Sequence, residues 1–193
     1  MLSFQLIPLF FAFAAPLVSA GPPLFVRKYE GCDTSKAVMD LPPNQTTLVA
    51  PATAPLFVLL GVGVQNYTCS GTTFASIGAV ASLFDISCLA GTSKFASIQN
   101  TAFNVWDHVP SSVPSTAIGP LVGAPYLDGF HYFVTSPLRH GYLAQMGFHL
   151  YRVAGDLASQ VFRIDTVNGQ PPTSCVAGSP PISVKYTSKY YLF

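Results

Sequence analysis

Charged side chains are scarce in this chain of 193 residues: they make up 9% of it, the formal net charge is +1, and 50% of the residues are hydrophobic. An ordinary soluble domain carries about 25% charged residues. A chain with so little basic charge lacks the electrostatic surface that binds nucleic acid or an anionic membrane. Its solubility must come from hydroxyl groups, amides and attached sugars, which favours a place outside the cell.

The motifs of two common enzyme classes are also missing. The run Gly-Val-Gly at 61–63 begins like the fingerprint of dinucleotide-binding proteins, but Asn66 stands where the third glycine belongs. A second apolar run follows, rather than the helix whose N-terminus would hold a pyrophosphate. We therefore predict no cofactor and interpret these glycines as points of close backbone approach or as strand bulges. The Gly-x-Ser-x-Gly elbow of serine hydrolases is absent too.

Acidic residues are too few to form an obvious catalytic pair. A glycosidase needs two carboxyl groups that face each other across a cleft. Asp85 and Asp128 are the only two on predicted strands or strand ends that could converge, with His131 beside them. The favoured interpretation is that these carboxylates cap turns or pair with Arg152 or Arg163. A hydrolase that uses Asp85, Asp128 and His131 remains the alternative.

The histidines do not predict a metal site. His131 and His149 could lie on neighbouring strands, with His140 between them in the sequence, but no third ligand is evident. Half-buried histidines that hydrogen-bond to backbone or tyrosine are the favoured interpretation. Copper chemistry at an N-terminal histidine is excluded, because the predicted mature chain begins at Gly21.

The features that are present point to export. Residues 1–20 consist of an apolar core followed by Val-Ser-Ala, which is typical of a signal peptide cleaved before Gly21. Pro16 interrupts the apolar run, so we expect no membrane span after cleavage. Two sequons, at Asn44 and Asn66, agree with glycosylation in the secretory pathway. We expect a secreted protein, either extracellular or in the cell wall.

Four cysteines lie in the predicted mature chain, and in an oxidising compartment they are expected to form two disulfides in one of three pairings. In a hairpin built from the runs 57–68 and 74–87, Cys69 would lie beside the turn and Cys88 at the far end, too distant to bridge. The favoured pairing is therefore Cys32 with Cys88 and Cys69 with Cys175. The spacing offers no Cys-x-x-Cys motif for zinc or redox chemistry.

The pattern predicts a mainly β domain, an antiparallel sandwich or a barrel-like domain, with one amphipathic helix and long loops rich in proline and glycine. Residues 21–55 form an extended arm pinned at Cys32, and residues 56–193 form a single β-rich domain. The helix spans about 93–107, follows a cap at 91–93 and ends before Pro110. One helical turn is expected within 116–122. Beyond the hairpin, strands are expected at 130–135, 145–153, 160–167 and 182–193.

Alternation in the last run, 182–193, predicts a half-buried strand. Its apolar side chains share one face, and Lys185, Thr187 and Lys189 take the other. Tyr132 and Tyr191 fall on faces opposite the apolar stripes, so we expect these two tyrosines to be exposed. Exposed tyrosines on a β surface can stack on sugars or contact other proteins.

Several spaced motifs resemble one family. LGVGVQNYTC at 60–69, IGAVASLFDISC at 77–88, GFHYF at 129–133 and VFRIDTVNGQPPTSC at 161–175 resemble, in this order, the fungal secreted proteins that carry domain of unknown function 3455. The resemblance implies a secreted β-rich domain without an established activity. Members are sometimes labelled malate dehydrogenases, which the residues of this chain do not support. The insert that usually follows HYF is shortened here to residues 134–147.

Three hypotheses follow. The leading one is a non-enzymatic secreted module that binds cell-wall polysaccharide or an extracellular protein, because aromatic residues are abundant and no catalytic constellation is evident. The second is the hydrolase described above, acting on polysaccharide. The third is a structural surface protein that associates with itself.

Overall fold

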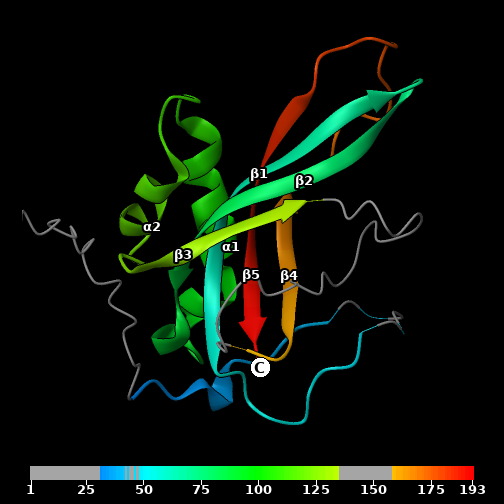
Figure 1. Cartoon of the computed structure of the whole chain (residues 1–193). Coiled ribbons are helices and arrows are strands. Elements are labelled where there is room, and N and C mark those ends of the chain that lie inside the picture. Colours follow the sequence, from blue (N-terminus) through cyan, green and yellow to red (C-terminus); the bar gives the residue numbers. More distant parts are fainter. Residues whose placement is uncertain (1–30, 42, 44–45, 47, 135–157) are drawn as a thin grey trace, which may run out of the picture.

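In the computed structural model, five strands form one antiparallel sheet in the order β3-β2-β1-β5-β4 (Figure 1). The structure describes residues 31–41, 43, 46, 48–134 and 158–193. The strands are β1 (Phe57–Ser70), β2 (Thr73–Asp85), β3 (Leu127–Val134), β4 (Val161–Asn168) and β5 (Ile182–Leu192). The prediction of a mainly β antiparallel domain is confirmed. The described strands leave the sheet open, as in a sandwich-like domain, rather than closed into a barrel.

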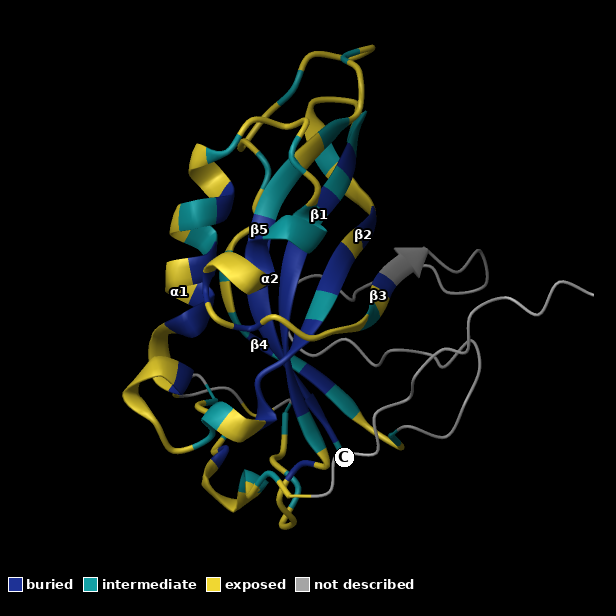
Figure 2. Ribbon diagram, turned by 90° about the vertical axis from the view of Figure 1, so that its left-hand side faces the viewer, coloured by how far each residue is buried: buried dark blue, intermediate teal, exposed yellow. Residues whose placement is uncertain are grey.

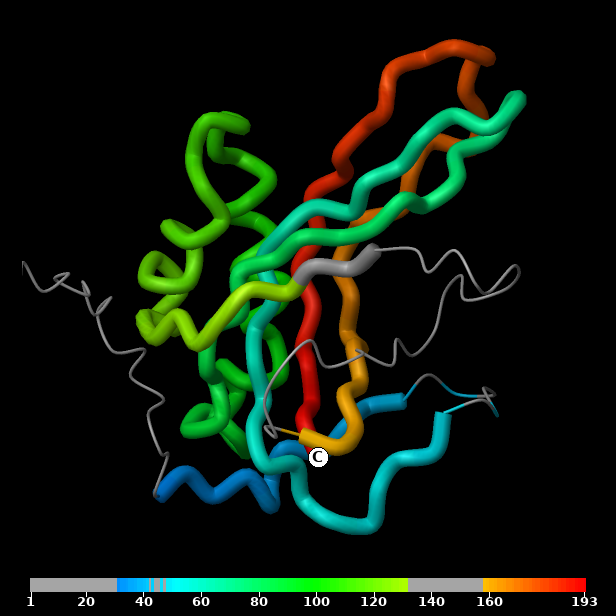
Figure 3. Tube along the Cα trace, viewed as in Figure 1, coloured from blue at the N-terminus to red at the C-terminus, as the bar shows by residue number. Residues whose placement is uncertain are grey.

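The hairpin of β1 and β2 is the centre of the sheet. Its two long apolar runs pair from Leu59 with Asp85 to Ser70 with Thr73, and Gly71 adopts the positive φ of 69° that the tight turn requires. A disulfide between Cys69 and Cys175 joins the hairpin tip to the loop between β4 and β5. Figure 3 shows that loop running beside the tip. The sequence favours this same pairing.

One amphipathic helix, α1 (Ser93–His108), covers one face of the sheet (Figure 2). The Thr92 side chain accepts a hydrogen bond from the Phe95 N–H and caps the helix, as expected from the sequence. The predicted helix is thus confirmed. Its apolar side chains pack against β1, β4 and β5, and they share the main core with residues from those strands: Phe95, Ile98, Ala102 and Trp106 from the helix, and Val58, Leu60, Val62, Phe162, Ile164 and Tyr191 from the sheet.

Short helical turns follow α1. A 3₁₀ turn, η3 (Ser115–Ala117), leads into α2 (Ile118–Leu121), where the sequence predicts one helical turn. The Ser115 hydroxyl lies 2.7 Å from that of Ser82 and links this segment to β2. Gly119 lies directly against the ring of Phe84, so α2 can approach the sheet closely only because this position lacks a side chain.

Strand β5 differs from its prediction. Its side chains alternate as expected, but the face with the lysines is covered by α1, so residues 186–192 are buried on both faces rather than half-buried. Lys185 Nζ donates to the carbonyls of Trp106 and Val109, at 2.7 and 2.8 Å. Carbonyls at the C-terminal end of a helix have no intrahelical hydrogen-bond donor. The ammonium group of Lys185, on the neighbouring strand, supplies the donors for two carbonyls at this end of α1. Lys189 Nζ forms an ion pair of 3.0 Å with Asp165.

The described part of the arm crosses the end of the sheet. A 3₁₀ turn, η1 (Thr34–Lys36), is held there by a hydrogen bond of 2.6 Å from the Thr34 hydroxyl to the Pro55 carbonyl. A disulfide joins Cys32 to Cys88, as the sequence favours. The signal peptide at 1–20 and the strand expected at 145–153 lie outside the described residues, and the domain boundaries remain predictions.

Candidate functional site

Small residues on β1 and β2 leave room for two tyrosine rings on the sheet face opposite α1. A Cβ atom on Gly61 would overlap the ring of Tyr190, and one on Gly63 would overlap the Val80 carbonyl and lie 2.6 Å from the Cα of Ala81. The interpretation as a point of close backbone approach is confirmed for Gly63, whereas the close neighbour of Gly61 is a side chain, the ring of Tyr190. Both lie inside strand β1, so they do not form the strand-to-helix turn of a dinucleotide site.

Replacing Gly63 by alanine is therefore expected to lower the free energy of unfolding by about 2 kcal/mol, since the new methyl group meets backbone that cannot move aside. Gly129→Ala is the matched control, because a Cβ atom on this strand glycine meets nothing within 4 Å. Its free energy of unfolding should stay within about 0.5 kcal/mol of wild type. Urea denaturation measures the free energy of unfolding of both variants. An equal loss in Gly63→Ala and Gly129→Ala would contradict the close approach at Gly63.

A cluster of polar side chains, here called the polar cluster, lies on this face of the sheet. Register places its members on one side of four strands: His131 of β3, Gln65 of β1, Tyr186 and Tyr190 of β5, and Arg163 of β4. The Tyr186 and Tyr190 hydroxyls are 2.9 Å apart, and the Tyr190 hydroxyl is 3.5 Å from His131 Nδ1. The polar cluster thus connects the two outer strands across the middle of the sheet.

Arg163 and Gln65 extend the polar cluster toward the hairpin. The guanidinium carbon of Arg163 lies 4.1 Å from the centre of the Tyr186 ring, within the range of a cation–π contact. A guanidinium N–H donates to Gln65 Oε1 at 3.3 Å, and Gln65 Nε2 donates to the Gly78 carbonyl at 2.7 Å. These bonds fix Gln65, which is only 5% exposed.

Burial keeps the titratable members of the polar cluster neutral at neutral pH. Desolvation, and secondly the charge of Arg163, lower the pKa of His131 from 6.5 to about 4. Desolvation also raises the pKa of Tyr186, and raises that of Tyr190 well above its ordinary value of 10.0. The guanidinium of Arg163 is therefore the only formal charge among these five residues.

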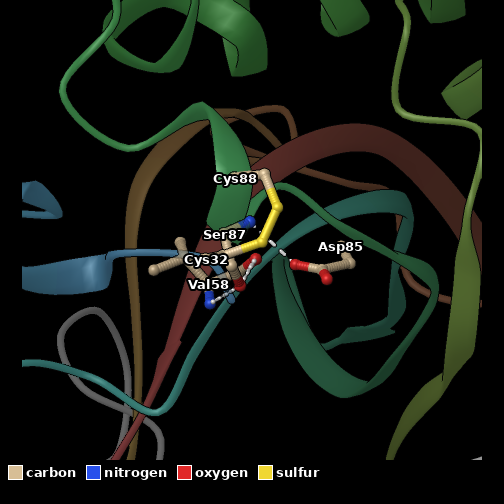
Figure 4. The surroundings of a disulfide bond; sticks show 5 residues. All are labelled: Cys32, Val58, Asp85, Ser87 and Cys88. Atoms are coloured by element: carbon tan, nitrogen blue, oxygen red, sulfur yellow. Dashed lines mark hydrogen bonds between the residues drawn. A yellow bond between two sulfur atoms is a disulfide. The ribbon is translucent and has the colours of Figure 1, made fainter. Parts of the chain in front are cut away.

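Asp85 holds a turn (Figure 4). Its Oδ1 accepts a hydrogen bond of 2.7 Å from the Ser87 N–H, and Ser87 Oγ accepts one of 3.0 Å from the Val58 N–H. The next residue is Cys88, which carries the disulfide to Cys32. Asp85 is 8% exposed, so its carboxylate shapes the turn that anchors the arm. This agrees with the turn-capping interpretation of Asp85.

The other two residues of the hydrolase hypothesis have different surroundings. Asp128 is exposed and is the additional residue of a bulge in β3, between Leu127 and Gly129. His131 is buried in the polar cluster, where it neighbours Tyr190. A hollow of about 400 Å³ lies between the arm and the end of β5, and its lining includes none of the three residues Asp85, Asp128 and His131.

The expected exposure of Tyr191 is wrong. The residue does lie on the face opposite the apolar stripe of β5, but α1 covers that face and leaves Tyr191 fully buried. Its ring meets that of Phe95 edge-on, and its hydroxyl donates to the Val38 carbonyl at 3.2 Å. Tyr191 is therefore a core residue that ties the arm to the sheet. The backbone of Tyr132 pairs with Val80, and its side chain lies outside the described residues.

An exposed apolar surface, here called the edge patch, lies on β2 and β3, on the same face of the sheet as α1 but toward the other edge. It consists of Phe130, which is 63% exposed, Val80 at 48% and Leu127 at 41%. Register puts Phe130 opposite Ser82 and Leu127 opposite Phe84, so these side chains and Val80 share one face. An exposed Phe130 is not among the predictions from the sequence. The signal that could have found it is strand alternation, which puts Phe130 and its neighbour His131 on opposite faces of β3.

Only some of the residues considered for glycosylation and metal binding lie within the described part of the chain. Asn66 is half-buried on β1, and its Oδ1 accepts a hydrogen bond of 2.7 Å from the Ser183 hydroxyl. Asn44, His140 and His149 lie outside the described residues. Within the described ranges, no group of three His, Cys, Asp or Glu side chains could hold a metal ion. No helix in this part of the chain is long and apolar enough to cross a membrane.

These features define a small β domain: an open antiparallel sheet covered by one helix and held by two disulfides. The model of one family, described as "Protein of unknown function (DUF3455)", matches residues 50–147, which is half of the chain. The chain belongs to this family. No curated protein and no solved structure matches it. The matched region contains β1, β2, α1, α2 and β3, and therefore both His131 and the edge patch.

Proposed function

We propose that this chain is a secreted, non-enzymatic binding module whose edge patch contacts a neutral cell-wall polysaccharide. The observation that carries the proposal is the exposure of Phe130, which is 63% accessible on β3, one of the two edge strands of the described sheet. Large apolar side chains that gather on a surface mark interaction sites more often than chance. An aromatic ring offers a flat apolar face, which matches the C–H face of a sugar ring.

The surroundings of Phe130 suit a neutral ligand. Val80 and Leu127 extend the surface across two strands. The whole chain carries few charges, so attraction to an acidic or basic polymer contributes little. Secretion is supported by the two disulfides, which persist in oxidising compartments.

Phe130→Ala is expected to reduce retention on insoluble polysaccharide by about tenfold, since an aromatic contact is worth about 0.5–1.5 kcal/mol beyond its buried area. The measurement is a pull-down on chitin, β-glucan and cellulose, with an unrelated secreted protein as background. Val49→Ala is the matched control, because it removes an apolar side chain that is 78% exposed on the arm. This variant should bind like wild type.

Other outcomes discriminate between the hypotheses. If wild type is not retained on any of the three polymers, the carbohydrate proposal is wrong. If light scattering then shows association that increases with concentration and is lost in Phe130→Ala, the edge patch joins copies of the chain and the structural hypothesis holds. Release of soluble sugar that disappears in Asp128→Asn would favour the hydrolase.

A further inference from the structure

The sequon at 66–68 lies within the central strand β1, although a surface loop is the usual setting of an N-glycosylation site. The side chain of Asn66 is nevertheless placed for modification. Its Oδ1 accepts the hydrogen bond of 2.7 Å from the Ser183 hydroxyl. Its Nδ2, the atom that carries a glycan, meets no partner among the described residues and is not enclosed by them. A glycan on Nδ2 leaves the bond to Ser183 in place.

The surroundings of Asn66 leave space for a sugar. Alternation puts Asn66 on the same face of β1 as Val64, which packs against the main core under α1. Val64 pairs with Lys185, and Lys185 bonds to the last carbonyls of α1, so the pair of Asn66 with Ser183 lies past the helix end. On β2, the residue opposite Asn66 is Gly78, which has no side chain. Neither α1 nor the paired residue of β2 therefore fills the space beside Asn66.

The order in which the strands are synthesised keeps Asn66 accessible during export. Strand β1 pairs with β5, the last strand, in which Ser183 follows Asn66 by 117 residues. Cys175, the disulfide partner of Cys69, follows it by 106 residues. At about 5–20 residues per second, the ribosome needs at least about 5 s to add this length. Until then one edge of β1 stays open, and a two-stranded hairpin alone is only marginally stable in water.

We propose that Asn66 receives an N-linked glycan before β5 closes the sheet. The co-reactant is an oligosaccharide carried on a lipid diphosphate of the secretory pathway. The nitrogen Nδ2 forms a bond to C1 of the first sugar, and the bond between C1 and the diphosphate oxygen breaks. The lipid diphosphate leaves with that electron pair, and Nδ2 loses one proton to a base of the transferring enzyme. Thr68, whose hydroxyl the sequon requires, follows Asn66 on the same face of β1.

The position of the glycan gives it an effect on the surface of the domain. Val80 of the edge patch is the next residue after Gly78 on the same face of β2, so it is a diagonal neighbour of Asn66. Side chains in this relation lie about 7–8 Å apart. The glycan therefore adds a hydrated surface beside the edge patch, in a chain of which only 9% is charged. Phe130, which carries the polysaccharide proposal, lies one strand further away, on β3.

The test uses the full chain expressed in a eukaryotic secretory host, with Asn44→Gln removing the other sequon from every variant. Mass spectrometry of the peptide that contains Asn66, from cells and medium, should show an oligosaccharide on most molecules. Thr68→Ser is the matched control and should keep the glycan, because serine retains the hydroxyl group. Thr68→Val has the same shape without the hydroxyl and should lose the glycan. An unmodified Asn66, or equal modification of the serine and valine variants, would overturn the proposal.

A pulse-chase experiment tests the order of events. We expect the glycan on newly made chains in which the thiols of Cys69 and Cys175 still react with an alkylating agent. Chains that already contain this disulfide and gain the glycan afterwards would show that the order is wrong. Either failure leaves the polysaccharide proposal intact, since Phe130→Ala tests that proposal separately.

Discussion

Replacing both Cys69 and Cys175 by serine is expected to lower the free energy of unfolding by about 4 to 5 kcal/mol. The two residues are separated by 106 positions, and a cross-link over a loop of this length removes about that much conformational free energy from the unfolded chain. The whole free energy of unfolding of a typical domain is only about 5–15 kcal/mol. Equilibrium unfolding in urea, on oxidised wild type and the serine variant, measures the difference.

The second disulfide provides the comparison. Cys32 and Cys88 are separated by 56 positions, so their replacement by serine should cost slightly less, about 4 kcal/mol. The two closed loops overlap between residues 69 and 88, so the effects should not add when all four cysteines are replaced. A loss below about 1 kcal/mol for the Cys69 and Cys175 variant would show that the unfolded chain is already restricted without this cross-link.

The hairpin and the helix could be predicted because local sequence determines them. The turn at Gly71 fixes the register of β1 and β2, and a strand slip by one residue would expose the apolar face. Thr92 and the 3.6-residue spacing of apolar side chains determine α1. The cysteine pairing followed from the hairpin, since its geometry keeps Cys69 away from Cys88.

What covers each face of the sheet could not be predicted. Alternation shows that Lys185, Lys189 and Tyr191 share one side of β5, but not that α1 lies on that side. The sequence therefore predicts an exposed Tyr191 on a half-buried strand, whereas α1 buries that face. Lysine side chains can lie between the sheet and α1 because the helix offers carbonyl oxygens to their ammonium groups.

The polar cluster was missed for a related reason. Its members come from four strands that are distant in the sequence, and Arg163 and Gln65 meet only through the order β1-β5-β4. The sequence did single out His131, but with Asp85 and Asp128 as its companions. The structure instead places His131 beside Tyr190, a contact of 5.4 Å between ring centres that strand order alone creates.

Acid is expected to destabilise the fold through His131, by about 3 kcal/mol between pH 6.5 and pH 4. The pKa of His131 is lowered from 6.5 to about 4 in the folded chain, mainly by burial and secondly by Arg163. The unfolded chain therefore binds a proton at a higher pH than the folded chain does. The contribution of neutral His131 to stability is complete above pH 6.5, decreases as the pH falls below that value, and is lost below about pH 4.

Urea denaturation at intervals from pH 7.5 to pH 4 measures this dependence, and His131→Gln isolates it. The glutamine variant does not titrate, so its free energy of unfolding should fall less steeply than that of wild type between pH 6.5 and 4. His108→Gln, which removes an exposed histidine from α1, is the control and should follow wild type. The lowered pKa of Asp33, caused by its hydrogen bonds to Ser35, affects stability only below its ordinary value of 3.8, outside this interval. Parallel curves for wild type and His131→Gln would mean that His131 is protonated, or exposed to water, in the folded chain.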